Sequence, residues 1–122
     1  MTIETRQDLG RWGEEVAVLA YALEGYACVA RRWRRAVGEL DLVLRRDGIL
    51  VFAEVKTRRG LAFGRPEEAV DARRLGRMRH VARHYLHEET PRGIDEYRFD
   101  VVAVEVGPGA GRLQVRILPG VV

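Results

Sequence analysis

Two short β-prone runs meet at an Asp-Gly pair, and this feature constrains the fold more than any other part of the sequence. The runs cover residues 39–46 and 49–57, and Asp47-Gly48 lies between them. An Asp-Gly pair between two such runs is a strong signal for a two-residue β-hairpin. We therefore expect the two strands to be antiparallel neighbours, with opposed residues that can be counted outward from the turn.

The rest of the chain supplies two helices and three further strands. Apolar residues at helical spacing predict a first helix from about Asp8 to Glu24, closed by Gly25. The apolar stripe of this helix is expected to be Leu9, Trp12, Val16, Leu19, Ala20 and Leu23. Pro66 is expected to start a second helix that runs to about His87. The further strands are expected at residues 26–35, 97–106 and 113–118.

The order of these elements is α-β-β-β-α-β-β, with no internal repeat or linker. The chain has 122 residues, of which 47% are hydrophobic, so it can bury a core without disulfides. A mixed β-sheet flanked by helices is the natural way to bury faces of this kind. We expect a single α/β domain over residues 1–122, with its core at about 9–118.

Nothing in the sequence indicates a membrane protein or a secreted one. No window reaches the roughly 18 continuous apolar residues that a membrane span needs. The N-terminus lacks the basic-then-apolar pattern of a signal peptide, and the single cysteine, Cys28, cannot form an internal disulfide. We expect a cytoplasmic protein without a membrane partner.

The basic residues form clusters that predict contacts with nucleic acid. The net charge of +3 is too small to establish such a partner, but the distribution of arginines favours a basic face. The candidate phosphate-binding residues are Arg31, Arg32, Arg34 and Arg35 around Trp33, and Arg58, Arg59 and Arg65 in and near the loop after the third strand. Strand alternation favours an exposed Trp33 that could stack on a base, and the alternative is a tryptophan in the core.

Lysine occurs once in the chain, at Lys56, whereas the other 20 of the 21 basic residues are arginine. An ammonium is a compact charge with a tunable pKa, whereas a guanidinium stays charged. If only one site needs an ammonium, a site of chemistry is the place where we expect it.

Two carboxylates are expected to face each other near this lysine. Asp41 and Glu54 occupy opposed positions when the hairpin is counted outward from its turn, and Lys56 shares a face with Glu54. Two close carboxylates repel each other, and Mg²⁺ is commonly held by one or two carboxylates together with water and phosphate oxygens. Carboxylates and an ammonium around one metal suit phosphodiester hydrolysis. The alternative is an exposed cross-strand ion pair.

The segments that carry these residues resemble the YraN family of small, largely uncharacterised bacterial proteins. The resemblance covers residues 9–106, and its motif segments are 38–43, 51–58, 98–102 and the start of the first helix around Gly13-Glu14. It implies a restriction-endonuclease-like fold of the PD-(D/E)XK nuclease superfamily, similar to archaeal Holliday junction resolvases. One departure is Leu40, which stands where the superfamily motif has proline.

The resemblance also implies roles for individual residues. It implies that Asp41 and Glu54 bind Mg²⁺ or Mn²⁺, that Lys56 assists the attacking water, and that Glu14 adds a further carboxylate. Glu39 is an extra acid that is either a metal ligand or a neighbour. From helical spacing alone, Glu14 lies opposite the apolar stripe and is expected to be solvated, with the adjacent Glu15 as a competitor.

The function implied is that of a metal-dependent DNA endonuclease, with branched or otherwise structured DNA as the candidate substrate and a homodimer as the candidate assembly. Two other functions stay open, because a fold does not determine a function. One is a nucleic-acid-binding module without turnover, and the other is a protein-interaction domain.

Overall fold

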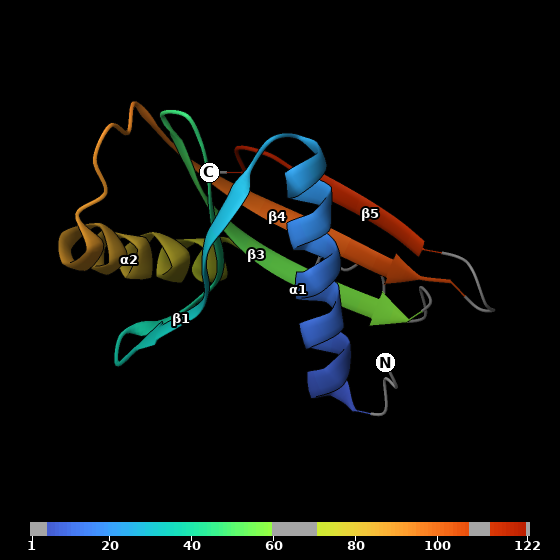
Figure 1. Cartoon of the computed structure of the whole chain (residues 1–122). Coiled ribbons are helices and arrows are strands. Elements are labelled where there is room, and N and C mark those ends of the chain that lie inside the picture. The colour runs from blue at the N-terminus through green and yellow to red at the C-terminus, as the bar shows by residue number, and fades with distance from the viewer. Residues whose placement is uncertain (1–4, 60–70, 108–112, 122) are drawn as a thin grey trace.

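The fold is a five-stranded mixed sheet with one helix on each face (Figure 1). The computed structural model of the chain describes residues 5–59, 71–107 and 113–121. Its elements are α1 (Arg6–Leu23), β1 (Ala27–Arg35), β2 (Gly38–Arg46), β3 (Ile49–Arg59), α2 (Ala72–Glu89), β4 (Glu96–Val106) and β5 (Leu113–Leu118). This order and the single α/β domain confirm the fold class predicted from the sequence. Within these described ranges, no helix is long and apolar enough to cross a membrane.

The predicted Asp-Gly turn joins β2 to β3 as an antiparallel hairpin. Arg46 lies opposite Ile49 on the two sides of the turn, and the pairing continues to Leu42 opposite Ala53. Asp47 adopts a left-handed backbone conformation (φ 50°), which aspartate tolerates in tight turns. The register predicted from the sequence is therefore confirmed along this part of the hairpin.

The strands lie in the order β1-β2-β3-β4-β5. The β3–β4 pair is parallel, and the other three pairs are antiparallel. Parallel neighbours need a crossover connection, and α2 lies in that connection. Residues 101–104 of β4 are all buried, as is typical of a strand covered on both faces.

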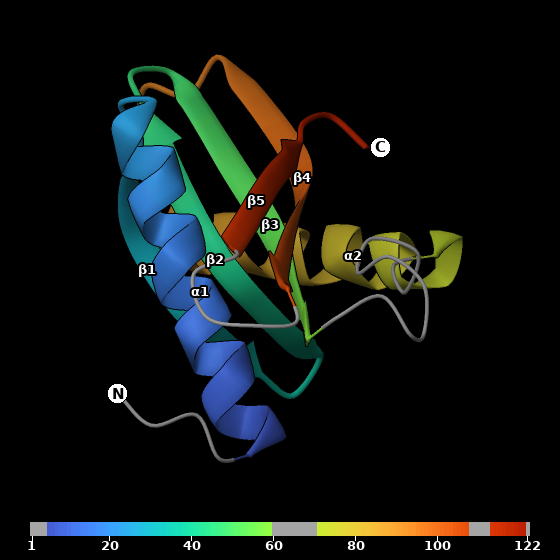
Figure 2. The ribbon, with the colours of Figure 1, turned by 90° about the vertical axis from the view of Figure 1, so that its right-hand side faces the viewer.

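Each face of the sheet has its own hydrophobic core, and Figure 2 shows the two helices on opposite sides of the strands. Leu42 and Ala53 pack under α1, whereas their neighbours Val43 and Phe52 pack under α2. Adjacent strand residues point to opposite faces, so one hairpin supplies both cores. Each fully buried Leu, Val or Phe side chain contributes about 1.5–3 kcal/mol.

The face of α1 that contacts the sheet differs from the predicted apolar stripe. Leu19 and Leu23 are 65% and 90% exposed, so their assignment to the core is wrong. The buried residues of α1 are Gly13, Ala17 and Tyr21. Two small residues let the helix axis lie close to the strands, and this close approach selects the face.

Gly13 is required by this close approach. A Cβ on Gly13 would lie 1.8 Å from Thr57 Oγ1 and 3.0 Å from Thr57 Cβ. We expect Gly13→Ala to lower the free energy of unfolding by about 1–3 kcal/mol, although alanine favours a helix. Gly10→Ala is the matched control, because its Cβ would meet no atom within 4 Å, and it should stabilise the protein by about 0.5–1 kcal/mol. Urea unfolding of both variants measures these changes, and equal effects would contradict the packing of α1.

Helix α2 begins at Ala72, whereas the predicted helix start at Pro66 lies outside the described residues. Asp71 is extended (φ −101°, ψ 179°), and its carboxylate accepts a hydrogen bond from the backbone N–H of Arg74 at 3.0 Å. This is an N-cap, which marks the start of the helix. Residues 66–70 lie outside the described residues. The buried residues of α2 are Met78, Val81, Ala82 and Tyr85.

Trp33 is a core residue, which resolves the alternative left open by the sequence. Its side chain is 7% exposed and packs edge-on against Tyr85, with ring centroids 5.3 Å apart. Two irregularities break the alternation of β1: a register shift between Cys28 and Ala30, and a positive φ of 44° at Arg32. The indole is therefore not placed to stack on a base.

Asp100 is the centre of a structural network in the core under α1. It is fully buried and accepts hydrogen bonds from Tyr21 Oη (2.7 Å), Arg98 Nε (2.8 Å) and the Gly120 amide (3.1 Å). Burial, followed by the charge of Asp100, raises the pKa of Tyr21. Asp100 thus forms a buried ion pair with Arg98.

Candidate active site

The candidate site lies where β2 and β3 separate. Their pairing reaches Leu42 opposite Ala53, after which β2 continues alongside β1 and β3 continues alongside β4. Figure 1 shows the end of the β1–β2 hairpin bending away from the end of β3. We call the place where β2 and β3 separate, after Leu42 and Ala53, the fork. Asp41 and Glu54 are the next residues on the two strands, so the hairpin register brings both carboxylates to the fork.

The Asp41 side chain bridges the fork. Its Oδ2 accepts a hydrogen bond from the backbone N–H of Val55 at 2.9 Å. A buried backbone donor beyond the last paired residues needs a partner, and the carboxylate supplies it. This bond holds the Asp41 carboxyl group against β3.

Asp41 is protonated more readily than an ordinary aspartate. Burial raises the pKa of Asp41 from 3.8 to about 8, and the charges of Glu54 and then Glu14 add to the rise, while the Val55 amide opposes it. Three carboxyl groups gathered in a partly buried place are electrostatically unfavourable unless a proton or a cation joins them. The electrostatics of the fork therefore favour the binding of a proton or a cation.

Two cationic side chains face Glu54. Lys56 Nζ is 3.5 Å from Glu54 Oε1, and an Arg74 guanidinium nitrogen is 3.8 Å from the same oxygen. The lone lysine thus lies beside the carboxylate with which it was expected to share a face. Arg74 was not singled out from the sequence as a site residue.

One cavity of about 370 Å³ collects these side chains. It is lined by every residue to which the sequence assigned a catalytic or metal-binding role, namely Glu14, Glu39, Asp41, Glu54 and Lys56. Arg74 and Arg77 of α2 line it as well. Their spacing of three residues, in register with the buried Met78 and Val81, was the sequence signal that could have revealed them.

Glu14 faces the cavity, so the expectation of a solvated residue is wrong. Its side chain is 13% exposed, and its Oε1 is 2.7 Å from Arg32 Nε. Because α1 turns Gly13 toward the sheet, Glu14 is carried toward the fork. Glu15 is 53% exposed and pairs with Arg31 outside the cavity, which removes it as the competing residue.

The two adjacent glutamates should differ in their effect on Asp41. Glu14→Gln removes a negative charge that raises the Asp41 pKa, so this pKa should fall in the variant. Glu15→Gln should leave it unchanged, because Glu15 points outward. Carboxyl-carbon NMR titration of Asp41 in both variants measures the difference, and equal shifts would show that α1 does not present Glu14 to the fork.

The arginines of β1 are engaged by glutamates. The pairs are Arg31–Glu15, Arg32–Glu14 (2.7 Å), Arg34–Glu39 (3.2 Å) and Arg35–Glu88 (2.6 Å). Arg35 also lies over the Trp33 ring, 4.2 Å from its centroid. The basic face expected from the arginine cluster is therefore partly neutralised, because the fold brings glutamates from other elements to it.

The other predicted phosphate-binding arginines follow Lys56. Arg58 and Arg59 end β3 and line a second cavity of about 500 Å³. This cavity also contains Lys56, so it adjoins the first one. Arg65 lies outside the described residues.

The donor set of the fork fits a hard divalent cation. Asp41 and Glu54 offer carboxylate oxygens, which Mg²⁺ and Mn²⁺ prefer. Among the described residues, no group of three or more His, Cys, Asp or Glu side chains is arranged to hold a metal ion by itself. Mg²⁺ is usually bound by one or two carboxylates, with water and substrate phosphate completing the shell, so a two-carboxylate site suits it.

Comparison with known proteins shows where the chain belongs. Residues 13–104 match the uncharacterised protein family UPF0102. The UPF0102 protein of Frankia alni is 46% identical over 120 residues, which cover 98% of both chains. That of Syntrophomonas wolfei is 44% identical over 107 residues, covering 88% of this chain and 92% of the relative. The predicted resemblance to a family of uncharacterised bacterial proteins is confirmed: the chain belongs to UPF0102.

Proposed function

We propose that this protein is a Mg²⁺- or Mn²⁺-dependent endonuclease that hydrolyses phosphodiester bonds in DNA. One observation carries the proposal: Asp41, Glu54 and Lys56 meet at the fork of a hairpin and line one open cavity. An exposed cross-strand ion pair does not explain this arrangement. Such a pair has no need of a third carboxylate from α1 or of a half-buried Asp41 whose pKa burial raises to about 8.

The carboxylates would hold the cation. Asp41 and Glu54 are the proposed ligands, and Glu14 adds negative charge at the edge of the same cavity. A bound divalent cation would supply a water of lowered pKa and would stabilise the charge that develops on the phosphate. Binding would replace the proton on Asp41, so it should release that proton and should strengthen as the pH rises toward 8.

Lys56 would act on the attacking water and the phosphate. Its ammonium lies 3.5 Å from Glu54 Oε1, where it can orient a water that approaches phosphorus and donate to a non-bridging oxygen. During hydrolysis the water oxygen forms a bond to phosphorus, and the bond to the leaving oxygen breaks. The water gives up a proton, and the leaving oxygen takes one up. Arg74 adds a second cation on the same side of Glu54.

A cleavage screen tests this function. The purified protein is incubated with labelled single-stranded, duplex and four-way-junction DNA in Mg²⁺, Mn²⁺ or EDTA. We expect cleavage of at least one form with metal and none in EDTA. Salt-sensitive binding that survives EDTA, without cleavage of any form, would instead support a nucleic-acid-binding module. A lack of binding even at low salt would favour a protein-interaction domain.

A further inference from the structure

Three cavities join into one groove that passes the N-terminal half of α1. The active-site cavity shares Gly10 and Lys56 with the second cavity, of about 500 Å³. It shares Gly10 and Asp41 with a third cavity, of about 300 Å³, on its other side. Gly10 lines all three, so the cavities adjoin at this residue and together form the groove.

The second cavity is the basic end of the groove. The charged residues among its described lining are Arg6, Lys56, Arg58, Arg59 and Arg74, with no acidic residue. Within the described parts of the chain, neither Arg6 nor Arg58 forms a side-chain hydrogen bond or ion pair. They differ in this respect from the β1 arginines, whose guanidinium groups are already engaged by glutamates.

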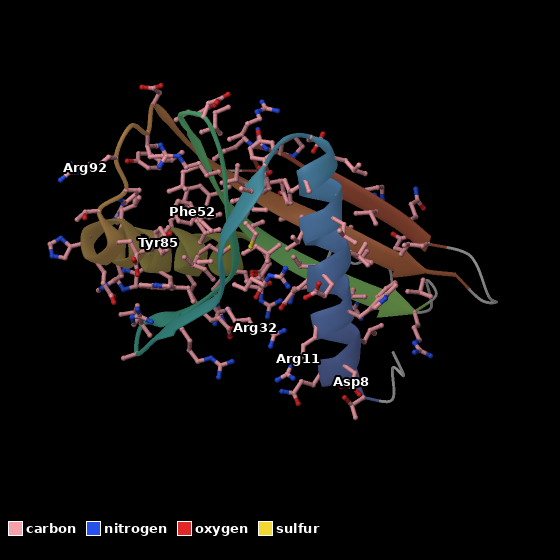
Figure 3. The ribbon with its side chains drawn as sticks, in the orientation of Figure 1. Asp8, Arg11, Arg32, Phe52, Tyr85 and Arg92 are labelled. Carbon is pink, nitrogen blue, oxygen red and sulfur yellow. The ribbon has the colours of Figure 1, made fainter. Side chains whose placement is uncertain are left out.

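The third cavity is more mixed in charge. Its lining includes Arg11, Arg32 and Arg34 together with Glu14 and Glu39. Figure 3 shows the labelled Arg11 and Arg32 side chains near each other beside α1, whereas the labelled Phe52 and Tyr85 lie in the core under α2. A strand that enters from the basic end would therefore pass the carboxylates and leave between arginines on the far side.

Gly10 has no packing reason for its place in a helix. A Cβ there would meet no atom within 4 Å, and the residue does not have a positive φ. Glycine inside a helix costs about 0.5–1 kcal/mol relative to alanine. Gly13, by contrast, is required by Thr57. Among the described residues, Gly10 alone lines all three cavities, and the absence of a side chain there leaves space where they meet.

We propose that a single strand of nucleic-acid backbone lies along this groove, passing α1 at Gly10. Arg6 and Arg58 bind phosphates on one side of the carboxylates, and the strand continues past Asp41 and Glu54. The guanidinium group matches a phosphate through two parallel hydrogen bonds, which suits these two unengaged arginines. The choice of a phosphodiester as ligand rests on the proposed function, whereas the path follows from the cavities and charges.

Binding of fluorescein-labelled single-stranded DNA in EDTA tests the basic end of the groove without cleavage. Arg6→Gln combined with Arg58→Gln should weaken binding at least about tenfold and lower the slope of log affinity against log salt by about 1.4, or about 0.7 for each lost phosphate contact. Arg31→Gln removes the same kind of charge outside the groove, and it should change affinity less than about twofold. Fluorescence anisotropy at several salt concentrations measures both quantities.

Two substitutions of different size at Gly10 test whether the strand passes α1 at this residue. Gly10→Ala adds only one methyl group, which meets no protein atom within 4 Å, so it should weaken DNA binding much less than a larger side chain does. Gly10→Leu keeps a strong helix former but fills the groove, so binding should weaken at least about tenfold. Thermal unfolding should show that both variants fold. An RNA strand of the same sequence, as a second probe, tells which sugar the groove accepts.

The outcomes separate this inference from the proposed function. If the groove variants bind DNA more weakly than the wild type, but the wild type cleaves no DNA with Mg²⁺, the proposed path of the strand is supported and the proposed nuclease activity is contradicted. The opposite result is that the wild type cleaves DNA while the double arginine variant and Gly10→Leu bind DNA as tightly as the wild type does. That result would support the proposed nuclease and contradict the proposed path of the strand. Equal weakening by Arg31→Gln and the groove variants would also overturn it, since binding would then depend on net charge alone.

Discussion

Glu54→Gln is expected to lower the rate of metal-dependent DNA cleavage by about a thousandfold or more. Glutamine preserves the size of the side chain but removes the charge that would hold the cation. It also leaves Lys56 and Arg74 without the carboxylate that they both face. Lys56→Ala should cost about a hundredfold to a thousandfold, because it removes a positioned donor but no metal ligand.

Glu15→Gln and Lys56→Arg are the controls for this pair of variants. Glu15 is a glutamate outside the cavity, so its neutralisation should leave the rate unchanged. Lys56→Arg retains the charge, but a planar guanidinium cannot take the place of a compact ammonium 3.5 Å from Glu54, so most activity should still be lost. Wild-type cleavage rates for both Glu54→Gln and Lys56→Ala would show that the fork is not the active site.

Asp41→Asn is expected to stabilise the metal-free protein by several kcal/mol near pH 8. A group whose pKa rises from 3.8 to about 8 on folding favours the folded state most below its unfolded pKa, and this contribution is lost as the pH climbs through its folded pKa. Wild-type stability should therefore fall between about pH 4 and pH 8, by on the order of 1.4 kcal/mol per pH unit from this residue. Asparagine does not titrate, and its carbonyl oxygen can still accept the hydrogen bond from Val55.

Urea unfolding in EDTA, from about pH 5 to pH 9, measures this difference. The two stability curves should lie close together at the acidic end and diverge as the pH rises. Parallel stability curves for wild type and Asp41→Asn would show that folding does not raise the pKa of the Asp41 carboxyl group. The expected divergence would show that the protein retains a costly carboxylate cluster at this place, as functional sites often do.

The position of the carboxylates could be predicted because it depends on a local turn. Two residues between two strands determine the register of a hairpin, so counting from Asp47 was enough to bring Asp41 and Glu54 together. The pairing of the two strands ends at Leu42 and Ala53, although both strands continue beyond these residues. This separation creates the cavity, and it depends on β1 and β4 holding the two strands in different directions.

The faces of α1 and β1 could not be predicted by the same kind of counting. Apolar spacing favoured Leu19 and Leu23, whereas the helix packs through Gly13 and Ala17, since close approach to the sheet depends on small side chains. In β1, a register shift and one residue with positive φ turned Trp33 into the core. The glutamate partners of the β1 arginines come from α1, β2 and α2, and contacts between distant segments leave no trace in local periodicity.

Calorimetric titration of Mn²⁺ into the protein, in the presence of a short single-stranded DNA, tests most directly whether the fork is a metal site. The DNA supplies phosphate oxygens, and a titration of DNA alone is subtracted. We expect wild-type binding that strengthens up to about pH 8 and releases a proton below it, with both effects lost in Asp41→Asn and retained in Glu15→Gln. Equal heats for wild type and Asp41→Asn, or no binding to either, would contradict a metal-dependent site at Asp41 and Glu54.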